Sequence, residues 1–153
     1  MFKLQDSKEI PLLRVNAHVY KHSSFGCTHL HLDCDSTEKA FSVAFRTIPK
    51  DHTGIAHILE HTVLCGSEKF PVRDPFFMMT RRSLSTFMNA MTYPDITAYP
   101  FATLNDKDFS NLLSVYLDAA FFPNIDELDF MQEGHRFELI KDGDKETLAL
   151  KGV

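Results

Sequence analysis

Several residue types are scarce in this chain of 153 residues, and each scarcity narrows the possible classes of protein. Tryptophan is absent, and the three cysteines, Cys27, Cys34 and Cys65, fit no paired spacing for a disulfide framework or a cysteine metal site. A reducing compartment is therefore the simpler expectation. No apolar run approaches the roughly 20 residues that a bilayer-spanning helix needs, and the first residues resemble neither a signal peptide nor a transit peptide.

An excess of charge of one sign is also missing. The chain carries 16 Lys and Arg against 21 Asp and Glu, a net charge of −5, and its cationic residues are scattered. We therefore expect neither a nucleic acid nor a membrane surface as a partner. Apolar residues make up 44% of the chain, and phenylalanine is abundant, with 14 copies. This composition and length are typical of a globular domain with its own core, or a large part of one.

Periodicity predicts strands and helices in alternation. Alternating apolar residues indicate strands at 14–20, 28–34, 40–47, 86–92, 97–103 and 135–140, and a further apolar segment begins at Leu148. Helical spacing predicts four helices. The first is opened by Gly54, and the second runs from Pro75 to about Arg82 with Asp74 as N-cap. The third is capped by Asn105 and stopped by Pro123, and the fourth covers 125–133 and ends with Gly134 at C′. Pro100 predicts a sheet edge or an irregularity in its strand.

The most informative stretch is His57-Ile58-Leu59-Glu60-His61. Histidines four residues apart on a helix project from one face, where both imidazoles can reach one metal ion. This H-x-x-E-H order is that of the inverted zinc peptidases, in which the glutamate accepts a proton from a zinc-bound water. A hydrolytic zinc site needs three protein ligands and one open position. The motif therefore predicts a zinc site with Glu60 as general base, and it leaves a third ligand to be supplied from elsewhere.

Simpler interpretations compete with each of these assignments. Histidines on a helix can be solvated or satisfied within a core, although the apolar residues between them favour an amphipathic helix with its polar face toward a cleft. Cys65 lies one turn beyond His61, where a small buried thiol is the more usual role. His29 and His31 share a strand face but have no evident third partner, so a solvated sheet face is the preferred interpretation.

Three longer segments resemble a known family. GIAHILEHTVLCGSEKFPVRDPF, SLSTFMNAMTYPDITAYPFAT and DFSNLLSVYLDAAFFPNIDELDFMQEGHRFEL are similar to the pitrilysin/insulinase superfamily, and most similar to its presequence peptidase (falcilysin-like) subfamily. The resemblance implies an α/β (α+β) fold, with an antiparallel-rich sheet and helices packed on one face. It also implies that residues 1–153 are the incomplete first domain of a much longer, monomeric, clamshell-shaped peptidase in the mitochondrial matrix or another organelle lumen.

The resemblance carries specific roles onto this sequence. His57 and His61 match the zinc ligands, one ion per full-length protein, and Glu60 matches the general base. The third ligand of the family is a glutamate expected just beyond Val153. Glu133, Glu138 and Glu146 are the less favoured candidates within the chain, and Glu133 falls in a segment that does not ligate the metal in the family. Asn89, Ala90 and Met91 match the edge strand to which a peptide substrate adds as a further strand. The expected activity of the full-length protein is hydrolysis of short unfolded peptides, such as cleaved targeting peptides.

Two other functions remain open at this point. The chain could be a non-catalytic fragment or partner module of the same fold, because its zinc site lacks the third ligand. A structural zinc module is the weaker alternative, since such sites usually have four Cys or His ligands in closed geometry.

Overall fold

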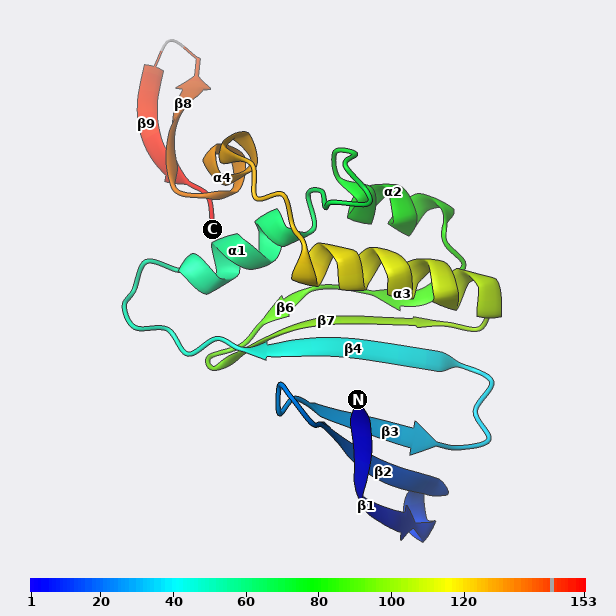
Figure 1. The fold of residues 1–153 in the computed structure, drawn as a ribbon. Helices are drawn as coiled ribbons and strands as arrows, with labels where there is room; N and C mark the ends of the chain where they lie inside the picture. Colours follow the sequence, from blue (N-terminus) through cyan, green and yellow to red (C-terminus); the bar gives the residue numbers. More distant parts are fainter. Residues whose placement is uncertain (144) are drawn as a thin grey trace. The chain divides into compact units, whose positions relative to one another are not determined.

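The computed structural model describes residues 1–143 and 145–153, which form two compact units, Met1–Thr37 and Glu38–Val153 (Figure 1). The first unit is an antiparallel sheet in the order β1-β2-β3, with the strands β1 (Phe2–Ile10), β2 (Val15–His22) and β3 (Thr28–Asp33) and the short 3-10 helix η1 (Pro11–Leu13). The predicted strands at 14–20 and 28–34 are confirmed. The first strand was not predicted, because nearly all its side chains are exposed and no apolar face marks it.

The second unit contains the main sheet and all four α-helices of the described residues. Its elements are β4 (Lys39–Arg46), α1 (Ile55–Val63), α2 (Pro75–Arg82), β5 (Ser85–Met88), β6 (Met91–Thr92), β7 (Ile96–Thr103), α3 (Asp106–Phe121), α4 (Glu127–Glu133), β8 (Arg136–Asp142) and β9 (Lys145–Lys151). The sheet has the order β4-β7-β5, and β6 also pairs with β7, so that β5 and β6 together form one edge. All pairings are antiparallel.

The core of this unit lies between the sheet and the helices, which Figure 1 shows on one side of it. The central cluster consists of apolar side chains from α1, β7 and α3 and the residue after α1: Val63, Leu64, Tyr99, Phe101, Leu112, Tyr116 and Ala119. The Asn105 side chain caps α3 as predicted, accepting a hydrogen bond from the backbone N–H of Asp108 at 3.0 Å. The predicted fold class, an antiparallel-rich α/β arrangement with helices on one face, is confirmed.

Pro100 lies in a central strand, so the predicted sheet edge at this residue is wrong. β7 pairs with β4 on one side and with β5 and β6 on the other. The irregularity that Pro100 also predicted is present: the neighbouring strand is interrupted between Met88 and Met91, and the Asn89 N–H donates to the Pro100 carbonyl at 3.1 Å. A proline is tolerated here because its missing N–H falls within an already irregular ladder.

Asp74 and Gly134 lie at the helix ends predicted for them, but neither has the usual geometry of a cap. Asp74 precedes α2 in a left-handed conformation, with φ 53°, and its side chain makes no capping hydrogen bond. The fixed φ of Pro75 at the first helical position starts the helix without that cap. Gly134 ends α4 as predicted, but with φ −72° and ψ 177° it is extended and lacks the left-handed conformation usual for a glycine at C′.

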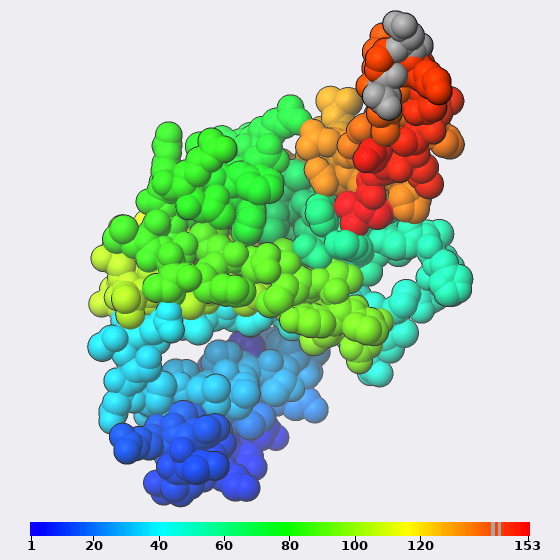
Figure 2. All heavy atoms as spheres, turned by 180° about the vertical axis from the view of Figure 1, so that it is seen from behind, coloured from blue at the N-terminus to red at the C-terminus, as the bar shows by residue number. Residues whose placement is uncertain are grey.

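The β8–β9 hairpin projects from its unit, as Figure 2 shows, and exposes several apolar side chains: Phe137, Leu139, Leu148 and Leu150. At its base the chain crosses itself. Gly152 has φ +104°, and a Cβ at this position would collide with the carbonyl oxygen of Gly134. Only glycine fits such a crossing. Within residues 1–143 and 145–153, no helix is long and apolar enough to cross a membrane.

Candidate active site

Helix α1 brings the three residues of the H-x-x-E-H motif to one pocket. Gly54 opens the helix with φ 72°, and its carbonyl accepts hydrogen bonds from the backbone N–H groups of His57 and Ile58, both at 3.0 Å. One turn separates the two histidines, so their rings lie 5.0 Å apart, centroid to centroid, with planes at 69°. Ile58 and Val63 are buried and hold the helix on the core.

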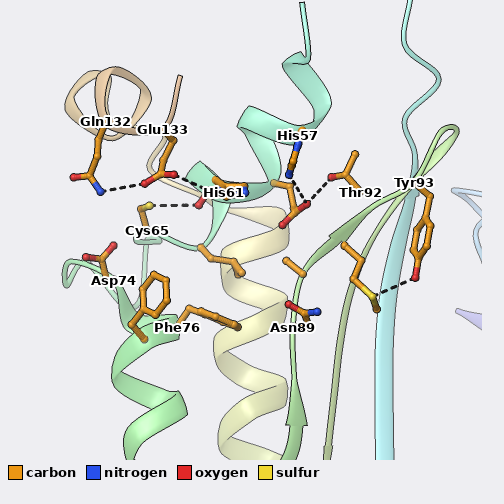
Figure 3. Close-up of a pocket in the computed structure, with 15 residues that line it drawn as sticks. His57, His61, Cys65, Asp74, Phe76, Asn89, Thr92, Tyr93, Gln132 and Glu133 are labelled. Carbon is orange, nitrogen blue, oxygen red and sulfur yellow. Dashed lines mark hydrogen bonds and ion pairs between the residues drawn. The ribbon is translucent and has the colours of Figure 1, made fainter. Parts of the chain in front are cut away.

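The pocket is a cavity of about 620 Å³ between α1 and the sheet edge (Figure 3). Its polar side is formed by the motif residues and by residues of α4, and its other wall by the edge segment 89–93. Leu64, Phe76 and Phe77 add an apolar wall. The H-x-x-E-H motif, the edge of the sheet at residues 89–93 and an apolar recess therefore meet in one cavity.

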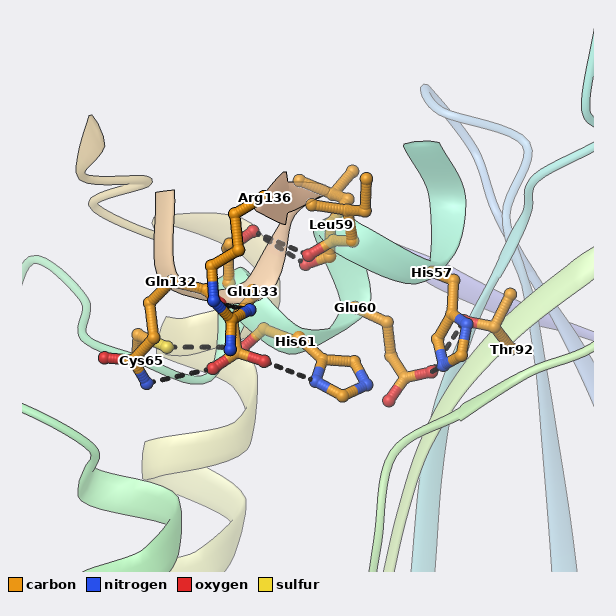
Figure 4. A network of polar contacts seen from close by, with 11 residues as sticks. His57, Leu59, Glu60, His61, Cys65, Thr92, Gln132, Glu133 and Arg136 are labelled. Carbon is orange, nitrogen blue, oxygen red and sulfur yellow. Dashed lines mark hydrogen bonds and ion pairs between the residues drawn. The ribbon is translucent and has the colours of Figure 1, made fainter. Parts of the chain in front are cut away.

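Glu60 is buried, with only 7% of its surface exposed, yet its carboxylate reaches the pocket. Its Oε2 accepts a hydrogen bond from the Thr92 hydroxyl at 2.7 Å and lies 4.0 Å from His57 Nε2 (Figure 4). The predicted base and the predicted ligand are thus adjacent. Thr92 was not predicted, since it lies 32 residues away and belongs to no motif.

His61 is oriented by a carboxylate from α4. Its Nδ1 lies 3.0 Å from Glu133 Oε2, and the Gln132 side-chain amide donates to Glu133 Oε1 at 3.0 Å. Arg73 donates in turn to Gln132 Oε1 at 2.7 Å. A histidine metal ligand almost always places its other ring nitrogen against such a group. The contact leaves Nε2 of His61 available to a metal and gives Glu133 a supporting role.

We expect Glu133→Ala in the full-length protein to weaken zinc binding about 10- to 100-fold, the usual cost of removing a group that orients a histidine ligand. Competition with a chelator of known affinity measures the change. Glu138→Ala is the matched control, because Glu138 pairs with Arg136 on β8 and makes no contact with either imidazole. Equal zinc affinities in the two variants would show that Glu133 does not support zinc binding through His61.

Cys65 is a weak candidate for metal binding. Its Sγ donates to the His61 backbone carbonyl at 3.4 Å. Burial, followed by the negative charges of Asp129, Asp74 and Glu133, raises the pKa of the Cys65 thiol to about 12. Since a thiolate is the form that binds metal, a neutral structural thiol remains the better description.

The donor set fits two of the three ligands of a hydrolytic zinc site. His57 and His61 face one cavity, and the described residues contain no group of three His, Cys, Asp or Glu placed to hold a metal ion. Glu138 and Glu146 lie on the β8–β9 hairpin and do not line the pocket. In the first unit, His29 and His31 stack at 6.3 Å on one face of the sheet, without a metal-binding third partner among the residues described.

The predicted substrate strand lies at the edge of the sheet and lines the pocket. Asn89 and Ala90 fall in the gap between β5 and β6, and Met91 begins β6, where it pairs with Ala98. The hydroxyl of the buried Tyr116 donates to the Asn89 carbonyl at 3.4 Å and holds this segment against α3. Peptide binding at Asn89, Ala90 and Met91 stays a prediction, for which the edge position is a requirement.

Comparison with known sequences places the chain among the peptidases. The family model "Insulinase (Peptidase family M16)" matches residues 46–143. The chain belongs to this peptidase family. It is 56% identical over 153 residues to the mitochondrial presequence protease of Mus musculus, covering 99% of this chain and 15% of that protein. It is also 56% identical over 138 residues to the mitochondrial presequence protease of Candida albicans, covering 90% of this chain and 13% of that protein.

A solved structure supports the fold. The crystal structure of pitrilysin superposes with a TM-score of 0.65 and 20% identity, covering 83% of this chain and 14% of pitrilysin. The chain therefore spans about 15% of the length of the curated relatives it matches. Those relatives are named as mitochondrial proteins, which agrees with the mitochondrial location that the resemblance implied.

Proposed function

We propose that the full-length protein is a zinc-dependent endopeptidase that hydrolyses short unfolded peptides, with cleaved organellar targeting peptides as the substrate class. One observation carries this proposal: α1 presents His57, Glu60 and His61 to a cavity whose opposite wall is a free strand edge. The relatives named presequence protease support the substrate class.

The roles of the side chains follow from their chemistry. His57 and His61 would hold the zinc, with Glu133 fixing the ring of His61 through Nδ1. Zinc, when bound, supplies a water of lowered pKa and polarises the scissile carbonyl. Glu60 accepts the proton of the attacking water and returns it to the leaving amine. Its Oε2 already accepts the Thr92 hydrogen bond, so Oε1 is the oxygen left for proton transfer.

The peptide is proposed to bind as an added strand along the segment 89–92. Strand addition uses backbone N–H and C=O groups and therefore accepts varied sequences. The apolar wall of Leu64, Phe76 and Phe77 gives room for one bulky apolar side chain close to the motif. Residues 1–153 alone are expected to be inactive, because the described residues supply two ligands and not three.

Metal removal tests the function. Treating the full-length protein with a zinc chelator is expected to abolish hydrolysis of an unfolded targeting peptide, and stoichiometric zinc is expected to restore it. The reason is that zinc both lowers the pKa of the attacking water and polarises the scissile carbonyl. Peptide cleavage followed by mass spectrometry provides the measurement. Full hydrolysis by protein shown to be free of metal would contradict the proposal and favour a different class of peptidase.

A further inference from the structure

The carboxylate of Glu60 is held by a hydroxyl from a different element. Thr92 Oγ1 donates to Glu60 Oε2 at 2.7 Å, across 32 residues of sequence, and Thr92 is the last residue of β6 (Figure 4). A hydrogen bond to an ionised carboxylate is shorter and stronger than one between neutral groups. The 2.7 Å between Thr92 Oγ1 and Glu60 Oε2 is at the upper end of the range of about 2.5–2.7 Å for a hydroxyl bonded to a carboxylate.

Thr92 also belongs to the edge of the sheet. Its backbone pairs with Thr97 of β7, which is buried and bonds through its own hydroxyl to Thr47 at 2.8 Å. The opposite side of β6 is unpaired within the part of the chain that the structure describes. One two-residue strand therefore contacts the general base and lies where a peptide would add.

We propose that Thr92 is a positioning residue for Glu60, and that through it the edge strand that receives the peptide also sets the orientation of the base. This inference rests on the proposed function. A glutamate side chain has three rotatable bonds, and freezing them costs conformational entropy. The Thr92 hydroxyl selects one rotamer of Glu60 by occupying Oε2, and it leaves Oε1 directed at the proton to be accepted.

Strand addition strengthens this arrangement. β6 pairs with β7 over only two residues, Met91 and Thr92, and it follows an interruption at Asn89 and Ala90. A peptide paired to the free side restricts the same backbone from a second direction, because each added ladder hydrogen bond limits the strand further. Glu60 is thus best oriented when substrate is bound, so that the loss of Thr92 lowers kcat and leaves KM nearly unchanged.

The test compares three variants of the full-length protein. Thr92→Val keeps the shape and removes the hydroxyl; we expect kcat to fall about 10- to 100-fold, the range for losing a hydrogen bond to a charged group. KM is expected to stay within about twofold, because Thr92 acts in this step on the base rather than on affinity. Zinc content is expected to stay unchanged, since the Thr92 hydroxyl bonds to Glu60 and not to His57 or His61. Thr92→Ser retains the hydroxyl and restores kcat.

Thr97→Val is the matched control, because it removes the hydroxyl of the residue paired with Thr92 without touching Glu60. Wild-type kcat in Thr92→Val would overturn the inference. So would a loss of kcat in Thr92→Ser or Thr97→Val as large as that in Thr92→Val, since all three would then report damage to the strand. A full-length wild type without zinc-dependent hydrolysis would instead refute the proposed function itself, and the inference with it.

Discussion

Glu60→Gln in the full-length protein is expected to lower kcat for peptide hydrolysis about 100- to 10,000-fold, the contribution of a positioned general base. The amide has the shape of the carboxylate but cannot accept the proton of the attacking water. Its oxygen can still accept the hydrogen bond of Thr92, so the pocket keeps its geometry. Zinc content should remain at the wild-type value, because Glu60 is assigned as base and not as ligand.

Turnover with a saturating peptide and zinc content by elemental analysis are the two measurements. Glu68→Gln is the control: Glu68 makes the same change of charge in an exposed loop, and it does not line the pocket. Wild-type turnover in Glu60→Gln would remove Glu60 from the chemistry. Loss of zinc together with turnover would make Glu60 a ligand and contradict the assigned roles.

The second large effect concerns the metal itself. A chain extended past the next glutamate beyond Val153 is expected to hold one zinc through dialysis, and residues 1–153 alone are expected to lose it. Removing a direct ligand should cost more than the roughly 10- to 100-fold that an orienting partner costs. His61→Ala in the extended chain should release the zinc as well. Zinc per chain, measured after dialysis, decides all three cases.

The position of Val153 supports this expectation. Its N–H donates to the Glu133 carbonyl at 2.9 Å, and the side chain of the same Glu133 contacts His61. A Cβ at Gly54, which opens α1, would lie 3.9 Å from the Val153 carbonyl. In the full-length protein, a residue following Val153 would therefore start beside the helix that carries both histidines. A third ligand a few residues further along has only a short distance to cover.

Two other outcomes of the zinc measurement would contradict this expectation. Tight zinc in both chains would mean a ligand within residues 1–153 and would reopen Glu133 and Cys65, which line the same cavity. Zinc in neither chain would leave the fold intact and contradict His57 and His61 as a sufficient core of the site.

Local patterns predicted one side of this site well. Both histidines and Glu60 come from a single helix, whose spacing alone places them on one face. The partners that orient them could not be found in this way. Glu133 lies 72 residues from His61, and Thr92 lies 32 residues from Glu60, so each contact depends on how α4 and β6 pack against α1. The sequence predicts no orienting role for Glu133, because residue type alone does not reveal a contact across 72 residues.

The same division holds for the fold. Strands and helices with a clear apolar face, such as β4 and α3, were predicted close to their observed bounds. β1 carries no such face and was not predicted. The central position of Pro100 depends on the order of the strands in the sheet, which local sequence patterns do not indicate. The helix ends at Asp74 and Gly134 were predicted correctly, but the capping hydrogen bond and the left-handed glycine were not found, because residue type at a helix end does not determine the backbone path of the adjoining loop.

Gly134 and Gly152 approach each other closely, so the two ends of the β8–β9 hairpin lie side by side. The chain leaves α4 and returns to nearly the same point, so the number of residues in between does not determine where it continues. Insertions or deletions within the hairpin should therefore be tolerated in evolution, whereas a side chain at residue 152 should not. The number of residues between His61 and the end of the hairpin is therefore expected to vary among relatives without moving the chain that follows the hairpin.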